Sequence, residues 1–151
     1  MSVVLESLPP AQRPGSWETF PHGADVGVRG YGADAAEAFA NAALALTSVI
    51  TDPALVHLVR RLPISCAADD VEILFLDWLN AIVSTMAIEG LIFGHYEVAI
   101  RDGVLEGVAI GEPLEPGRHH PVVEVKGATL TELKVARGDD GRWLAQCIVD
   151  V

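Results

Sequence analysis

Apolar residues recur at helical spacing in an alanine-rich segment that ends at about Ile50. Asp34 precedes this segment and can accept a backbone N–H, and Glu37 three residues later completes a capping-box pattern. Thr51-Asp52-Pro53 ends the pattern, because proline cannot continue a helix. One stripe of the predicted helix carries Phe39, Ala43, Leu46 and Ile50.

A second helix is predicted from a cap at Asp69, with Glu72 three residues later, to a C-terminal glycine at Gly90. Its apolar residues again recur at helical spacing, which predicts one deeply buried face. The residues on that face are Val71, Leu74, Phe75, Trp78, Ile82 and Met86.

Alternating apolar and polar residues predict strands in the rest of the chain. Three precede the second helix, over 16–20, 26–31 and part of 55–67. After that helix, Asp102-Gly103 separates predicted strands over 96–100 and 105–110, and Asp140-Gly141 separates 130–136 from 143–149. Asp-Gly is the preferred chemistry of a tight hairpin turn.

The order of these elements predicts an α+β fold with two layers, in which two helices pack on one face of a mixed or antiparallel sheet. Residues 1–16 carry three prolines without sustained periodicity and are predicted to form a flexible extension. Residues 17–151 are predicted to form a single domain.

Composition narrows the function classes. The chain of 151 residues carries 21 acidic and 10 basic residues, a net charge of −11, which repels phosphate backbones and favours basic proteins and divalent cations. We therefore expect no direct high-affinity binding of nucleic acid. Cys66 and Cys147 form no paired motif and are expected to be buried thiols. Without a leader pattern or an uninterrupted span of about 20 apolar residues, we expect a cytoplasmic protein outside the membrane.

Common enzyme motifs are missing from the sequence, including GxxxxGK[ST], HExxH and GxSxG. Two acidic positions could instead hold a metal. Asp25 lies with His22 in a short loop ahead of a strand, where an aspartate more often forms a cap or a turn. Asp150 lies beside the terminal carboxylate of Val151, and hard cations such as Ca²⁺ or Mg²⁺ prefer several oxygen ligands of this kind. A site here requires the Asp25 loop to lie beside Asp150.

A third candidate region begins at Gly111-Glu112, continues through Arg118-His119-His120 and reaches Val125-Lys126. Adjacent histidines can bind transition metals, but they face opposite ways in an extended chain. A polar loop followed by a strand, with Lys126 facing solvent, explains the same residues.

Taken together, these stretches resemble the archease family, in the family's order and from about Trp17 onward. The loop from Phe20 to Gly27 is similar to its E-H-x-A-D-[VI]-G signature, with Pro21 and Gly23 as departures. Departures also occur where the family has V-K-A and T-Y-H, at Gly127, Leu130 and Thr131. The other matching blocks are Tyr31-Gly32, Glu37 to Ala42, Asp77 to Asn80, Gly111-Glu112, Arg118-His119, Val125-Lys126 and Trp143 to Val151.

The resemblance implies a non-catalytic factor that promotes guanylylation and multiple turnover of an RtcB-type RNA ligase in tRNA splicing or RNA repair. It implies a divalent metal site at Asp25, Asp150 and Val151, with calcium expected and magnesium or manganese as alternatives. Contacts with the ligase are expected at the remaining candidate residues, which are His22, Glu112, Arg118, His119 and Lys126.

Two other functions remain open on the sequence. A general chaperone or assembly factor would expose a large apolar patch. A metal-dependent hydrolase of small phosphorylated substrates would turn over by itself, but the sequence specifies no nucleophile or general base.

Overall fold

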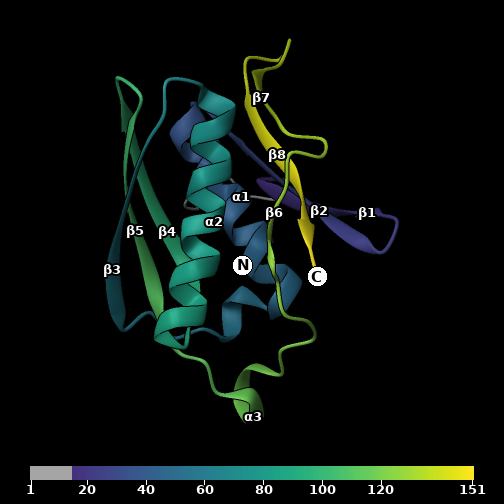
Figure 1. Cartoon of the computed structure of the whole chain (residues 1–151), viewed down its shortest axis with the longest axis vertical. Helices are drawn as coiled ribbons and strands as arrows, with labels where there is room; N and C mark the ends of the chain where they lie inside the picture. The colour runs from purple at the N-terminus through teal and green to yellow at the C-terminus, as the bar shows by residue number, and fades with distance from the viewer. Residues whose placement is uncertain (1–14) are drawn as a thin grey trace, which may run out of the picture.

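The computed structural model describes residues 15–151, so the extension predicted over 1–16 lies, up to residue 14, outside the described residues. Its elements form two antiparallel sheets rather than one (Figure 1). The larger sheet has the order β1-β2-β8-β6, with β7 also paired to β8, and the smaller sheet has the order β3-β5-β4. The strands are β1 (Trp17–His22), β2 (Asp25–Gly32), β3 (Arg60–Ala67), β4 (Leu91–Arg101), β5 (Val104–Pro113), β6 (Gly127–Ala128), β7 (Lys134–Arg137) and β8 (Trp143–Asp150).

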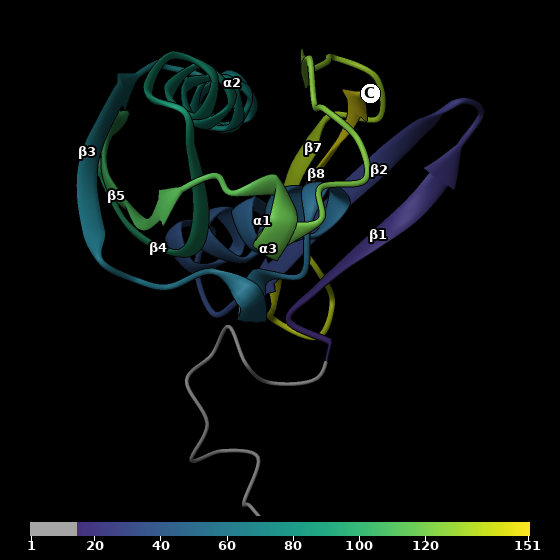
Figure 2. The same cartoon turned by 90° about the horizontal axis from the view of Figure 1, so that it is seen from below.

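The predicted α+β class is confirmed, whereas the helices do not lie on one face of a single sheet. Helices α1 (Ala35–Ile50) and α2 (Val71–Glu89) lie between the two sheets, and each contacts strands of both (Figure 2). The reason lies in α1, which is buried almost all round, including Ala38, Ala42 and Ala45. A helix that is apolar on every side needs cover from two directions. Two short helices complete the fold, η3 (Pro53–Leu55) and α3 (Pro116–His119).

The observed helix caps are those predicted from the sequence, with one exception. Asp34 accepts the Glu37 N–H at 2.8 Å as predicted, and Gly90 ends α2 with φ 67°. The N-cap of α2 is Asp70 and not Asp69, because the Asp70 carboxylate accepts the N–H groups of both Glu72 and Ile73. The Glu72 carboxylate is then free to accept the Val135 N–H of β7 at 3.0 Å.

Both predicted hairpins form, but only the first has the predicted two-residue turn. Asp102 and Gly103 have φ values of 51° and 75° and join β4 to β5 in a two-residue turn, which Asp-Gly favours. By contrast, residues 138–142 separate β7 from β8, because the Asp140 carboxylate accepts the Arg142 N–H and the Gly138 N–H bonds to the Arg142 carbonyl. The strand predicted over 130–136 begins only at Lys134, since Glu132 has a positive φ of 54°.

The core is centred on α1 and the first part of α2. Trp78 is fully buried and donates its indole N–H to the Phe39 carbonyl at 3.1 Å, which joins the two helices. At Gly30 the β2 backbone approaches α1 so closely that a Cβ would lie 2.2 Å from the Ala38 carbonyl oxygen. This contact fixes β2, and therefore the end of β2 that carries Asp25.

Candidate functional site

Asp25 and Asp150 lie opposite each other at one end of the larger sheet. Val26 pairs with Val149 in the antiparallel ladder of β2 and β8, so continuing that register by one residue brings the two aspartates together. The Val151 N–H donates to the Asp25 carboxylate at 3.3 Å, which fixes the same proximity. We call Asp25, Asp150 and Val151 the acidic tip. Asp25 and Val151 are 126 positions apart in the chain, and the sequence alone did not show that they lie close together.

Strand β6 supports the acidic tip from the other side of β8. Gly127 pairs with Asp150, and the Lys126 N–H donates to the Asp150 carbonyl at 2.8 Å. Asn80 of α2 holds β6 in place, because its amide accepts the Ala128 N–H at 2.9 Å and donates to the Ala128 carbonyl at 3.3 Å. No sequence pattern predicted this role, because Asn80 stood out only as part of the matching block Asp77 to Asn80.

The acidic tip carries negative charge without a basic side chain to neutralise it. Asp150 is exposed and Asp25 half-buried, and within residues 15–151 neither forms a salt bridge. Like charges directly opposite each other on paired strands repel. Two exposed basic residues lie beside the tip. His22 is the register partner of Asp25 across the β1–β2 turn, and the Lys126 N–H bonds to the Asp150 carbonyl.

The donors of the acidic tip fit a hard divalent cation, because all of them are oxygens. Across the described part of the chain, no group of three or more His, Cys, Asp or Glu side chains could hold a metal. A metal at the tip would therefore take two side-chain carboxylates and an oxygen of Val151, with water at the remaining positions.

Three other predicted residues form a separate cluster, the Glu112 network, made of Glu112, Arg118 and His119. Glu112 is the next-to-last residue of β5 and is 5% exposed. Arg118 and His119 lie on α3, in the connection from β5 to β6 (Figure 1). Arg118 donates to one Glu112 carboxylate oxygen. The other oxygen accepts the His57 N–H at 2.6 Å and bonds to His119 Nε2 at 3.0 Å.

Hydrogen bonds set the protonation pattern of this network. The Glu115 N–H donates to His119 Nδ1 at 2.9 Å, so Nε2 carries the proton that His119 donates to Glu112. Burial raises the pKa of Glu112, but the hydrogen bonds from Arg118, the His57 amide and His119 outweigh it and lower the pKa to about 2. Glu112 is therefore an anion whose oxygens are fully occupied.

The structure thus divides the predicted site residues into two groups. Lys126 and the acidic tip come together, with His22 on the adjoining turn. The Glu112 network lies elsewhere, and the His119 side chain is fully buried, so in this conformation it supports Glu112 and cannot itself touch a partner. The local sequence did not predict that His119 is buried, because α3 is a single helical turn between two polar stretches.

The two cysteines behave as buried thiols rather than as a reactive pair. Both are free, and burial raises the pKa of the Cys147 thiol to about 12. Burial also raises the pKa of Cys66, which is half-buried.

Comparison of this chain with known proteins identifies its family. Residues 17–151 match the model of the archease protein family (MTH1598/TM1083). The chain belongs to the archease family. Protein archease of Pyrococcus furiosus is 40% identical over 139 residues, which cover 89% of this chain and 98% of that protein. Protein archease of Sulfolobus acidocaldarius is 31% identical over 137 residues, covering 89% and 98%.

Solved archease structures have the same fold. The solution structure of Methanobacterium thermoautotrophicum protein 1598 aligns with a TM-score of 0.75 and 29% identity, covering 90% of this chain and 99% of that one. The crystal structure of an archease from Thermotoga maritima, described as a possible chaperone, aligns with a TM-score of 0.60 at 14% identity, covering 89% and 96%. The second likeness concerns the fold alone. The sequence relatives bear the name protein archease and not the name of an enzyme.

Proposed function

We propose that this archease is a non-catalytic activator of an RtcB-type RNA ligase, and that it acts through its acidic tip. The observation that supports this proposal is the pairing of Asp25 with Asp150 at an exposed end of the sheet. In this proposal the tip enters the mouth of the ligase active site in the cytoplasm and promotes its guanylylation during tRNA splicing or RNA repair.

The tip offers oxygen donors of the kind that hard divalent ions prefer, and water would complete the coordination. Asp25 and Asp150 would hold a divalent ion, calcium first and magnesium or manganese as alternatives, together with an oxygen of Val151. Such an ion, when bound, supplies charge that neutralises phosphoryl oxygens. The protein's own contribution is to hold both carboxylates on two paired strands, so that their positions change little when a partner approaches.

Charge supports a protein partner rather than nucleic acid. A net charge of −11 disfavours a phosphate backbone, while a ligase that binds RNA must present basic surface. In this proposal, exposed Lys126 beside Asp150 and exposed His22 beside Asp25 contact the ligase around the tip.

A general chaperone is the second candidate, because several large apolar side chains are exposed. Ile88 is 80% exposed and Val122 is 76% exposed, and the Thermotoga maritima archease is described as a possible chaperone. This candidate predicts that the protein suppresses aggregation of unrelated unfolded proteins at equimolar concentration, which the activator need not do.

The test counts ligations per molecule of RtcB-type ligase from the same organism, with RNA ends in excess, GTP and Mn²⁺. We expect ligation to stop near one turnover without this protein and to continue when it is added. The double variant Asp25→Asn/Asp150→Asn should lose at least about tenfold in turnover, because both proposed ligands are lost. The matched control is Asp139→Asn, an exposed aspartate in the β7–β8 loop, which should activate fully.

Equal activation by the double variant would remove the tip from the proposal. No activation by the wild-type protein, together with suppression of aggregation, would favour the chaperone. Hydrolysis of GTP by this protein alone would favour the hydrolase.

A further inference from the structure

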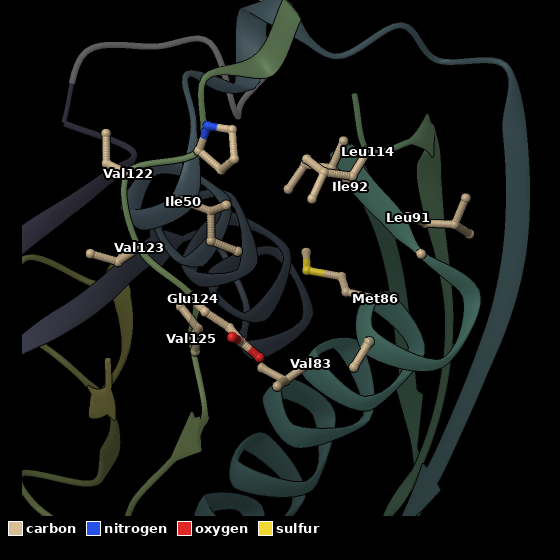
Figure 3. A pocket seen from close by; sticks show the side chains of 13 residues that line it. Ile50, Val83, Met86, Leu91, Ile92, Leu114, Val122, Val123, Glu124 and Val125 are labelled. Carbon is tan, nitrogen blue, oxygen red and sulfur yellow. The ribbon is translucent and has the colours of Figure 1, made fainter. Parts of the chain in front are cut away.

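An apolar groove of about 540 Å³ opens between the C-terminal half of α2, the start of β4 and the segment Pro121–Val125 (Figure 3). We call it the apolar groove. Its walls belong to segments far apart in the sequence, and almost all of its lining is aliphatic. Representative lining residues are Ile50, Val83, Met86, Leu91, Leu114 and Val122.

Helix α2 forms one wall and is more exposed than its composition suggests. By length and apolar character it could cross a membrane, a property that core helices share, yet only 28% of that apolar window is buried. Its fully buried residues all lie between Leu74 and Ile82. The helix continues to Glu89, with Ile88 80% exposed, so its last two turns present apolar surface that residues 15–151 do not cover.

The opposite wall is an extended segment with free main-chain donors. The Val122 N–H bonds to the Ile50 carbonyl at one end, and the Lys126 N–H bonds to the Asp150 carbonyl at the other. Between them, the N–H groups of Val123, Glu124 and Val125 have no protein partner within residues 15–151. A segment anchored at both ends, with its main chain open in the middle, is suited to pair with another strand.

The charge of the groove is negative. Among its lining residues in the described part of the chain, only Glu124 is charged, and Figure 3 shows its carboxylate directed into the groove toward Val83. Exposed Glu89 and the negative end of the α2 dipole lie at the same end of the helix. The groove therefore complements an apolar ligand that carries a positive charge.

We propose that the apolar groove binds an extended segment of a partner protein, made of apolar residues around a lysine or arginine. The main chain of this segment pairs with residues 123–125, alternate apolar side chains enter the groove, and the basic side chain meets Glu124. The segment Pro121–Val125 spans roughly 16 Å, which matches about five extended residues. This docking site is distinct from the acidic tip and needs neither metal nor ligase.

The test uses fluorescent seven-residue peptides and anisotropy, without ligase or metal. The probe is glycine-leucine-valine-lysine-valine-leucine-glycine, and its partner has glutamate in place of lysine. We expect the lysine peptide to bind saturably and the glutamate peptide to bind roughly fivefold more weakly, because attraction to Glu124 becomes repulsion. Glu124→Lys should reverse this preference, and the control Asp139→Lys should leave it unchanged. Methylating the valine amides of the lysine peptide should weaken binding about tenfold, because it removes main-chain donors.

Ala87→Trp tests the groove itself, because Ala87 is an exposed lining residue that a tryptophan side chain would extend across the groove. It should weaken the lysine peptide about tenfold. If this variant unfolds, the reversal by Glu124→Lys tests the same groove without filling it. Equal binding of both peptides, or binding that Glu124→Lys does not alter, overturns the proposal. So does a wild-type dimer in sedimentation that Ala87→Trp converts to monomers, since the groove then holds a second copy of this chain.

Discussion

The acidic tip and the Glu112 network both join distant parts of the chain around carboxylates, but they treat those carboxylates in opposite ways. Glu112 is buried, and its two oxygens are occupied by Arg118, the His57 amide and His119. Asp25 and Asp150 face each other near solvent without a basic partner in the described residues, and a single long hydrogen bond from Val151 reaches Asp25. A carboxylate whose hydrogen bonds are complete stabilises the fold, whereas a carboxylate pair left open is available to a ligand.

The largest expected difference between the two regions comes from matched histidine substitutions. His119→Ala should lower the free energy of unfolding by about 2–4 kcal/mol, because it opens a buried cavity and removes one donor from Glu112. His22→Ala, at an exposed position beside the tip, should change it by less than about 0.5 kcal/mol. Urea unfolding measures both. Equal losses would mean that the two regions do not differ as their burial indicates.

Calcium should act on the tip alone. At a free concentration near 100 times its dissociation constant, Ca²⁺ should raise the free energy of unfolding of the wild-type protein by about 2.7 kcal/mol. Asp150→Asn should remove this gain, whereas Glu112→Gln should keep it from a lower starting stability. Thermal unfolding with Ca²⁺ or with chelator checks this. A gain that survives in Asp25→Asn/Asp150→Asn would place the ion elsewhere.

Asn80 should link stability to the tip, because it holds β6 beside Asp150. Asn80→Ala should cost about 1–2 kcal/mol through two lost hydrogen bonds and should also weaken Ca²⁺ binding several-fold. Ser84→Ala, at an exposed position of the same helix, is the control and should change neither. Calorimetric titration with Ca²⁺ gives the affinity, and unchanged affinity in Asn80→Ala would show that β6 does not position the tip.

The smallest expected effect is a change in how steeply the unfolding free energy depends on pH, because it involves a single proton. The Glu112 pKa falls from its ordinary value of 4.5 to about 2 in the fold, so the ionised form stabilises fully above about pH 4.5. This stabilisation is lost as the pH falls toward 2. Glu112→Gln should therefore flatten the acid limb of a plot of unfolding free energy against pH by up to one proton. Parallel limbs for wild type and variant would contradict the assigned hydrogen bonds.

Local signals predicted the parts of the fold that local chemistry decides. Asp34 caps α1 by a hydrogen bond to a residue only three positions away, and Gly90 ends α2 by its own positive φ. The Asp102-Gly103 turn likewise depends only on the φ values of these two residues. At Asp140-Gly141 the same dipeptide lies in a longer loop, because the Asp140 side chain bonds to the Arg142 amide instead. Asp69 and Asp70 are both aspartates at the start of α2, so the sequence could not decide between them as the cap. In the structure Asp70 caps the helix and Glu72 bonds to Val135 of β7, 63 positions away.

The site was predicted less completely, because its organisation depends on long-range pairing. Asp25 and Asp150 were candidates because of their places in a short loop and at the chain end, and the resemblance implied a metal site at the same residues. Their proximity came only from the strand register. No periodicity identified Asn80 as the support of β6. Likewise, the adjacent pair His119-His120 could not reveal that one ring is buried and the other exposed, because that depends on a single turn of helix packing against Glu112.

The pairing of β2 with β8 also has a kinetic consequence. Asp25 and the Val151 amide lie 126 positions apart, so the tip requires closure of a loop that includes nearly every described element. Closing long loops costs chain entropy before contacts repay it, and folds rich in such contacts form slowly. We therefore expect the tip to assemble late in folding. A chain whose β8 is cleaved or trapped off the sheet cannot present the two aspartates together. Any partner that recognises the pair thereby selects chains that have finished folding.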